Sequence, residues 1–249
     1  FYYTARKRAI GPFKKQLWDL DDATKGEICG ELQERFELIF NSLNVVNTSS
    51  MVRDLTPIQK LPFRAGDEIS DVLVEGNAVR DCSEHGLMFW GNWQWEKMDC
   101  RRISFIGNRV IRGGAGAIWG TGCVGVVATG NIVEQCADVG IDLEWCEQGA
   151  ISGNTVSGAA NAGISLFYSC RDVAITGNTV VIPDADKGER IGIWLTGTNT
   201  REFPGDQGHR DVTILGNVVR AEGRAGRGIA IPPEAREVLA QANVLVNAE

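Results

Sequence analysis

Beyond residue 66, the chain is organised as short runs in which apolar and polar positions alternate. Glycine-rich corners separate these runs, as in GLMFW at 86–90, GISLFY at 163–168 and GIWLTG at 192–197. Alternation with a period of two predicts strands that bury one face. Strands this short cannot bury that face alone, so the pattern indicates many strands stacked on one another.

A Gly-Asn turn recurs through the same region and sets the period of the stack. Its copies are VEGNAV at 74–79, FIGNRV at 105–110, ATGNIV at 128–133, ISGNTV at 151–156, ITGNTV at 175–180 and ILGNVV at 214–219, with a degenerate copy, QANVLV, at 241–246. The asparagines at 108, 131, 154 and 178 follow one another at intervals of 23, 23 and 24 residues. This period predicts a solenoid in which each coil contains one Gly-Asn turn and two longer coils carry insertions.

Most residues of the repeat are predicted to stabilise the fold. Apolar residues before each turn and the valine two residues after each asparagine are predicted to form inward columns, Val133 and Val156 among them. Glycine and asparagine tolerate the left-handed backbone of tight corners, and stacked amides hydrogen-bond from coil to coil. We therefore expect the asparagine column to support stability rather than activity.

A Gly-Asn-x-Val repeat of this period, followed by a Gly-Ile run, resembles the pectate-lyase-like superfamily over residues 67–249. The resemblance implies an all-β solenoid, a right-handed single-stranded parallel β-helix of about six coils. Pectate lyases, polygalacturonases, alginate-acting enzymes and phage tailspikes share that fold, so it also implies a poly- or oligosaccharide partner. The Asn-Thr-Asp, Asp-Asp and Gly-His-Gly set of polygalacturonases and the Asp-Pro-His-Asp set of the epimerases are absent. The subfamily is therefore not assigned.

Residues 1–66 lack the repeat and are predicted to form a separate segment. Apolar residues at helical spacing, from Ile28 to Leu43, predict an amphipathic helix. Such a helix would cap the open end of a β-helix, or would connect it to a preceding domain.

Net charge limits the classes of binding partner, and the cysteine spacing has a structural explanation. The formal net charge of -7 and the pI near 5.0 argue against nucleic acid and membrane surfaces, which both require a basic face. Cys100, Cys123, Cys146 and Cys170 recur once per coil and are predicted to be a ladder of buried thiols. The chain begins with Phe1 and shows no signal sequence, so we expect a fragment or processed product, with an extracellular, virion or cell-surface location suspected. The tailspike resemblance leaves a homo-oligomer open, a trimer in that case.

Aromatic residues mark one outward face of the Gly-opened strands. Alternation places Trp90, Trp119, Phe167 and Trp194 there, and flat aromatic rings suit the apolar faces of sugars. Insertions at 91–99 and 197–210 leave from the corner after these strands, so the loops are predicted to wall a groove. Their candidate substrate-binding residues are Trp93, Trp95, Phe203 and His209.

Two acidic residues stand in the middle of this face. Asp142 and Glu144 are two residues apart on one strand, about 6.7 Å at Cα and on the same side. Glycoside hydrolysis requires two carboxyl groups, one as acid and one as base or nucleophile, so this pair is the predicted catalytic site. Asp138 or Glu147 is an alternative second partner. A passive acidic surface and a calcium site are alternatives for the pair, whereas no other cofactor or metal is expected. A polysaccharide lyase and a non-catalytic spike or adhesin module are the alternatives for the protein.

Overall fold

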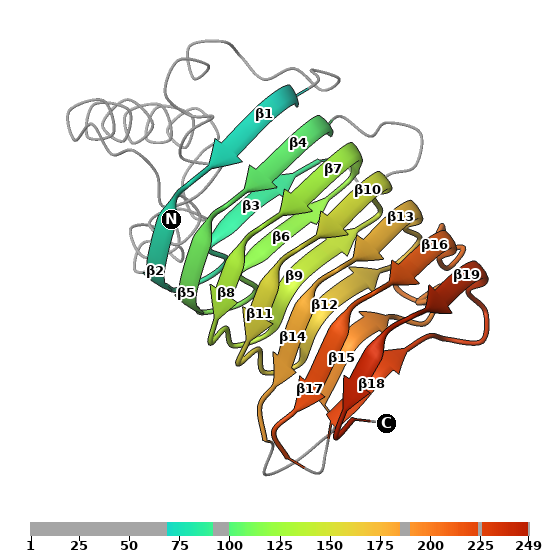
Figure 1. The fold of residues 1–249 in the computed structure, drawn as a ribbon. Helices are drawn as coiled ribbons and strands as arrows, with labels where there is room; N and C mark the ends of the chain where they lie inside the picture. Colours follow the sequence, from blue (N-terminus) through green and yellow to red (C-terminus); the bar gives the residue numbers. More distant parts are fainter. Residues whose placement is uncertain (1–68, 92–99, 185–189, 224–225, 249) are drawn as a thin grey trace, which may run out of the picture. The chain divides into compact units, whose positions relative to one another are not determined.

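The computed structural model describes residues 69–91, 100–184, 190–223 and 226–248 (Figure 1). The chain divides into two compact units, Phe1–Phe63 and Arg64–Glu249. All described residues belong to the second unit. The predicted N-terminal helical cap lies outside the described residues and stays a prediction.

The described residues form three parallel β-sheets, called sheets A, B and C. Sheet A contains β1 (Ile69–Glu75), β4 (Cys100–Ile106), β7 (Cys123–Thr129), β10 (Glu147–Ser152), β13 (Arg171–Thr176), β16 (Arg210–Leu215) and β19 (Arg236–Gln241). Sheet B contains β2 (Ala78–Cys82), β5 (Arg109–Gly113), β8 (Ile132–Glu134), β11 (Thr155–Ser157), β14 (Thr179–Ile182), β17 (Val218–Ala221) and β20 (Val244–Val246). Sheet C contains β3 (Leu87–Trp90), β6 (Ile118–Thr121), β9 (Val139–Glu144), β12 (Ala162–Phe167), β15 (Arg190–Leu195) and β18 (Gly226–Ala230).

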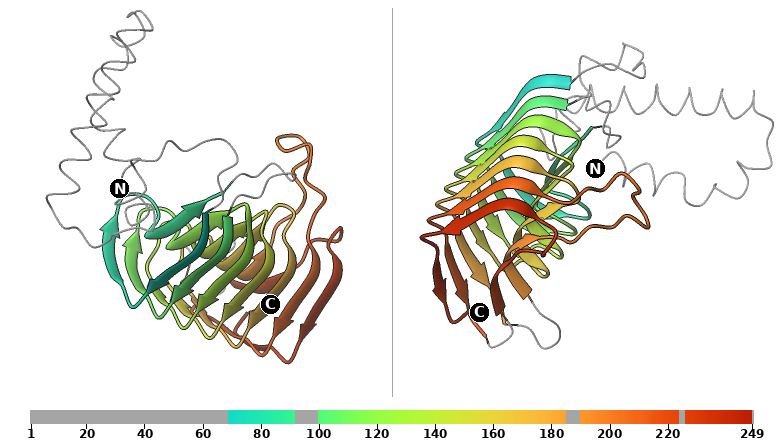
Figure 2. Two further views of the ribbon diagram at one scale, coloured as in Figure 1. Left: turned by 90° about the horizontal axis from the view of Figure 1, so that it is seen from above. Right: turned by 90° about the vertical axis from the view of Figure 1, so that its right-hand side faces the viewer.

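The chain passes through the three sheets in turn and then repeats. Each strand pairs in parallel with the strand three places later, as β4 does with β7, β5 with β8 and β6 with β9. The stacked coils are visible from above and from the side (Figure 2). Sheets of seven, seven and six strands make a right-handed β-helix of six to seven coils, which confirms the predicted architecture for this part of the chain.

The core follows the inward columns predicted from the repeat. Val110, Val133, Val156 and Val219 are 0% exposed, and the apolar residues before the turns, such as Phe105, Ala128 and Ile151, are buried with them. In register, Val156 lies between Val133 and Val180. The columns fill the interior of the solenoid, so their residues serve stability.

The Gly-Asn turn works as a backbone corner with a ladder of side chains. Gly107 and Gly153 have φ of +60° and +62°, and a Cβ at either position would meet nothing within 4 Å. Glycine is therefore favoured there by the left-handed backbone and not by space. The side chain of Asn108 donates from Nδ2 to Oδ1 of Asn131 at 3.0 Å and to the carbonyl oxygen of Val74 at 2.8 Å. The same pattern continues through Asn131, Asn154, Asn178, Asn217 and Asn243.

Replacing Asn154 by alanine is expected to lower the free energy of unfolding by about 2–4 kcal/mol, because it leaves buried donors unpaired. The backbone N–H and the side-chain amide of Asn131 both donate to Oδ1 of Asn154. The measurement is urea unfolding followed by circular dichroism. Asn77→Ala is the matched control, since Asn77 is only half-buried and its change should cost less. Equal losses in the two variants would contradict the role given to the ladder.

Most strands of sheet C have a glycine near their beginning, for a different reason, whereas β6 has Ala117 at that register. A Cβ at Gly163 would lie 2.3 Å from Cγ1 of Val180, and one at Gly140 would lie 2.4 Å from Cγ1 of Val156. No real Cβ approaches another carbon so closely, so at these two positions sheets B and C meet at a distance that only glycine permits.

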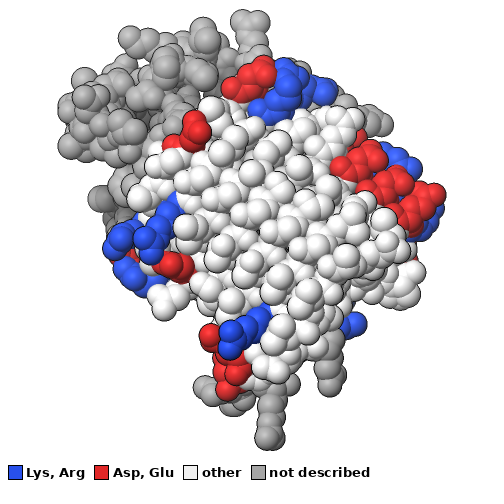
Figure 3. Space-filling model, in the orientation of Figure 1, with Lys and Arg blue, Asp and Glu red and all other residues white. Residues whose placement is uncertain are grey.

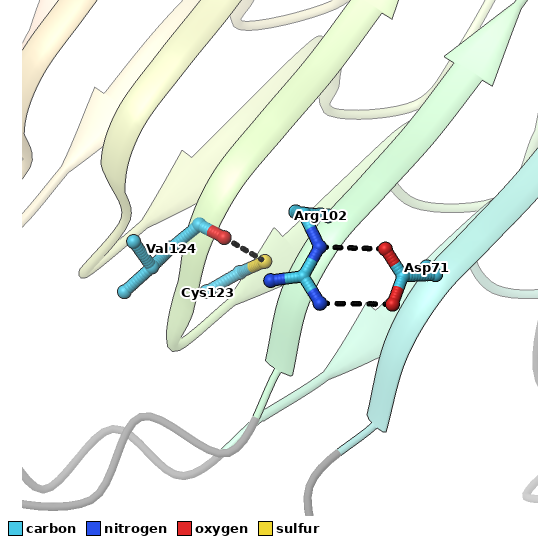
Figure 4. Close-up of polar contacts among 4 residues, drawn as sticks. All are labelled: Asp71, Arg102, Cys123 and Val124. Carbon is cyan, nitrogen blue, oxygen red and sulfur yellow. Dashed lines mark hydrogen bonds and ion pairs between the residues drawn. The ribbon is translucent and has the colours of Figure 1, made fainter.

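The cysteine ladder consists of thiols packed inside the solenoid. Cys100 pairs in register with Cys123, and both are buried, as are Cys146 and Cys170. Cys123 Sγ lies 3.7 Å from the carbonyl oxygen of Val124 (Figure 4). Burial raises the pKa of Cys146 and of Cys170, so these thiols stay protonated and behave as small hydrophobic side chains.

The outer faces of sheets A and B carry few charges in their middle, and charged side chains gather along the edges (Figure 3). The edge charges include ion pairs between neighbouring coils, such as Arg102 with Asp71 at 2.6 Å, drawn in Figure 4, and Arg112 with Asp81 at 2.6 Å. All four side chains are at least half exposed, so each pair adds little stability. Candidate chemistry lies instead on sheet C.

Candidate functional site

Two columns of side chains project outward from sheet C. In register, the first column is Met88, Trp119, Asp142, Ser165, Trp194 and Ala230. The second column is Trp90, Thr121, Glu144 and Phe167. The outward face predicted from alternation is therefore present, and the acidic pair stands in its middle on β9.

The two acids differ in their surroundings. Asp142 is 7% exposed, whereas Glu144 is only half-buried and accepts a hydrogen bond at 3.1 Å from the indole N–H of Trp119. Burial raises the pKa of Asp142 well above its usual value, and the charges of Glu144 and Asp138 raise it further. Burial also raises the pKa of Glu144, but the hydrogen bond from Trp119 opposes that shift. Asp142 is thus the group that holds its proton to higher pH.

A buried hydroxyl lies beside each acid in register. Ser165 pairs with Asp142, and Thr121 pairs with Glu144. Within the described structure, Ser165 Oγ, Thr121 Oγ1 and Asp142 Oδ1 are buried without a hydrogen-bond partner. Buried polar atoms are normally satisfied, so these three atoms distinguish the surroundings of the acids from the rest of the core.

Aromatic side chains lie on both sides of the acids. On one side, Trp119 meets Trp90 edge-on, with ring centroids 5.6 Å apart, and stacks on His85 at 4.8 Å. On the other side, Phe167 meets Trp194 edge-on at 5.4 Å. Trp90 is 57% exposed and the other rings of these two pairs are half-buried. The predicted aromatic residues therefore lie on the same face as the acids, and their role in substrate binding stays a prediction.

Trp119→Phe is expected to raise the pKa of Glu144 further. Phenylalanine keeps a ring against His85 but removes the N–H that stabilises the charged carboxylate. The measurement is the titration of the Glu144 carboxyl carbon by NMR. Trp194→Phe is the matched control: the hydrogen bond to Glu144 comes from Trp119, so this variant should leave the titration of Glu144 unchanged. An unchanged Glu144 pKa in Trp119→Phe would show that the hydrogen bond does not tune this group.

A cluster of three rings closes the corner that follows β9 and β12. Trp145 stacks on Tyr168 with centroids 4.0 Å apart, and Phe203 packs edge-on against Trp145 and Tyr168 at 4.8 and 4.5 Å. Trp145 and Tyr168 have φ of 44° and 60°, and Gly122, one coil earlier, has φ of 67°, so left-handed backbone recurs at this corner of the solenoid. Burial raises the pKa of Tyr168 to about 12, and the charge of Glu144 adds to it.

The insertion that carries Phe203 is fastened by buried polar contacts. Asp206 Oδ1 accepts a hydrogen bond from Ser169 Oγ at 2.7 Å, and Asp206 Oδ2 accepts one from the backbone N–H of Asn199 at 2.7 Å. The loop therefore holds the ring cluster in place at one end of β9 and β12.

The predicted wall residues have different outcomes. His209 is 1% exposed and burial lowers its pKa to about 4, so it lies beneath the surface and not on an exposed wall, and its role stays a prediction. It lies directly before β16, beneath the surface, because the inserted loop returns to the core there. Trp93 and Trp95 lie outside the described residues, and their role stays a prediction.

Other residues of this region were not singled out from the sequence. Tyr168, His85, Thr121 and Ser165 lie beside the acids or their aromatic neighbours. Alternation along each strand puts Thr121 and Ser165 on the same outward face as the acids, so their positions could have been found from the repeat. Nothing in the local sequence signals the stacking of His85.

The described residues also bear on metal binding and on membrane insertion. In residues 69–91, 100–184, 190–223 and 226–248, no group of three or more His, Cys, Asp or Glu side chains is placed to hold a metal ion. The calcium alternative stays a prediction. No helix in the same residues is long and apolar enough to cross a membrane.

Comparison with known proteins identifies the fold family. No curated protein matches the chain. Among solved structures, the chain is similar to the catalytic domain of a GH87 alpha-1,3-glucanase variant in complex with tetrasaccharides, at 10% identity and a TM-score of 0.28. That match covers 70% of this chain and 52% of the other, so this chain spans about half of that domain, and the likeness is too distant to bear on activity. The model of the right-handed beta helix region matches residues 65–202, more than half of the chain, and the protein therefore belongs to the right-handed β-helix family.

Proposed function

We propose that this protein hydrolyses a glycosidic bond in a poly- or oligosaccharide, with Asp142 as general acid and Glu144 as base or nucleophile. The observation that supports the proposal is the unequal burial of two carboxyl groups on one strand. A passive acidic surface would leave both groups solvated with ordinary pKa values. Here burial raises the pKa of both, and of Asp142 the more strongly, as a site for acid and base chemistry requires.

The two roles follow from the contacts of each carboxyl. The side chain of Asp142 is enclosed and faces the charges of Glu144 and Asp138, so its protonated form is favoured. A protonated carboxyl can donate to the leaving oxygen of the glycosidic bond. Glu144 accepts the Trp119 N–H, which favours its charged form. A charged carboxylate can activate water or attack the anomeric carbon.

The aromatic pairs and buried hydroxyls supply binding. Flat indole and phenyl rings suit the apolar faces of sugar rings, and an exposed ring such as Trp90 is otherwise costly. Ser165 and Thr121 stand beside the acids, and their hydroxyl groups are buried without a hydrogen-bond partner. Binding and chemistry thus share one face of the solenoid.

The test is a reducing-end release assay on a panel of neutral and acidic polysaccharides. Wild type is compared with the double variant Asp142→Asn/Glu144→Gln, whose folding is checked by circular dichroism. We expect release by the wild type and its loss in the folded variant. Equal release by both would refute the assignment of the acids. Binding without release by the wild type would instead indicate a glycan-binding β-helix, and an unsaturated product would indicate a lyase.

A further inference from the structure

We infer that the substrate is an uncharged polysaccharide that lies along the axis of the β-helix on sheet C and is cleaved within the chain. The inference rests on the proposed function for its cleavage step. Its binding step depends on the arrangement of aromatic and charged residues alone.

The direction of the bound chain follows from the order of the coils. The strands that carry the platforms and acids are β3, β6, β9, β12 and β15, each paired with the next. Neighbouring strands are about 4.8 Å apart, so Trp90 and Trp194 lie about 19 Å apart along the axis. The acids stand midway between them. A ligand that contacts both tryptophans and the acids must run across the strands, along the axis.

Cleavage within the chain follows from the platforms on both sides. The pair Trp90 and Trp119 precedes the acids, and the pair Phe167 and Trp194 follows them. Each pair meets edge-on, so the two rings of a pair differ in the surfaces they present. Sugar units are thereby bound on both sides of the scissile bond. A site that removes terminal units needs binding mainly on one side.

The expectation of an uncharged substrate follows from the charged residues on the outward face of sheet C. In the described residues of the two outward columns of sheet C, no lysine or arginine occurs. The nearest arginines in register, Arg190 and Arg227, lie at the beginnings of β15 and β18, ahead of these columns. A uronate carboxylate placed beside the charged Glu144 would meet a like charge, and no lysine or arginine among the described residues of the two columns offsets it.

Burial of the acids strengthens this discrimination. Electrostatic repulsion grows where water is excluded, and the charged Glu144 is half-buried. Asp138, whose carboxylate accepts a hydrogen bond from Asn161 at 2.6 Å, adds a further negative group near the pair. A neutral sugar offers hydroxyl groups to the same acids without this repulsion.

Binding is tested in the folded Asp142→Asn variant, so that no turnover occurs. Calorimetry is run with neutral polysaccharides and with their carboxylated counterparts of equal length. We expect binding of a neutral polymer, and at least tenfold weaker binding of its carboxylated form. Adding Trp90→Ala or Trp194→Ala should each weaken binding about tenfold. Leu239→Ala, which removes an exposed apolar side chain from sheet A, is the matched control and should leave binding unchanged.

Cleavage position is tested with the wild type by following polymer length and released products together. Cleavage within the chain lowers polymer length before small sugars accumulate. Preference for the carboxylated polymer, dependence on only one of the two tryptophans, or release of terminal units alone would each overturn the inference. If the neutral polymer binds across both tryptophans but no bond is cleaved, the proposed hydrolysis fails and the binding assignment stands. If a bond is cleaved but neither tryptophan substitution weakens binding, the proposed hydrolysis stands and the binding assignment fails.

Discussion

Replacing Val156 by arginine is expected to unfold the β-helix. Val156 is 0% exposed and is stacked between Val133 and Val180 in the core of sheet B. Arginine is longer than valine and would place a charge where no acidic partner lies in register, so both overpacking and desolvation oppose folding. The combined cost exceeds about 4 kcal/mol, a large fraction of the stability of a domain.

The measurement for Val156→Arg is circular dichroism and elution volume of the purified variant. We expect loss of the β-sheet signal and an expanded or aggregated species. Thr155→Arg is the matched control, because Thr155 is the exposed neighbour on the same strand and should accept arginine with little loss. A folded Val156→Arg protein would show that the coil register is wrong.

The core could be predicted from the sequence because the repeat constrains each position many times. A strand alternates in and out, and parallel coils stack in register, so Val110, Val133 and Val156 fall in one column once the Gly-Asn turn is aligned. The same alignment placed Asp142 and Glu144 on the outer face beside Trp119 and Phe167. These features depend only on period and register.

The environment of the acids could not be predicted in this way. Alternation shows that Asp142 points outward, but its 7% exposure depends on the packing around it, which spacing does not define. The bond from Trp119 to Glu144 depends on a rotamer, and that rotamer is supported by the stacked ring of His85. Neither is a property of spacing.

Insertions were the least predictable part of the site. The loop that follows β15 was expected to present Phe203 and His209 to a ligand. Instead, Phe203 packs on Trp145 and Tyr168, while His209 returns to the interior. An inserted loop breaks the repeat, so the register that positions every other residue does not apply within it.

Asp142→Asn is expected to lower hydrolysis of a polysaccharide by about 10²–10⁴-fold, the usual contribution of a general acid. Asparagine keeps the size of the side chain but carries no proton that it can donate. The loss should be much smaller on an aryl glycoside with a good leaving group, since departure of that group does not require protonation. Glu144→Gln should lose similar activity on both substrates, because a base or nucleophile is needed in either case.

The pH dependence of the wild type gives the same assignment an independent test. A general acid must be protonated, so activity falls as pH rises through the pKa of Asp142. Because burial raises that pKa, the fall occurs at a higher pH than for an ordinary aspartate. Asp138→Asn is the matched control: it removes a charge that raises the pKa of Asp142, so it should retain activity and move the fall to lower pH. In the comparison of the two substrates, an equal loss of activity of Asp142→Asn on the polysaccharide and on the aryl glycoside would show that Asp142 does not act as the acid.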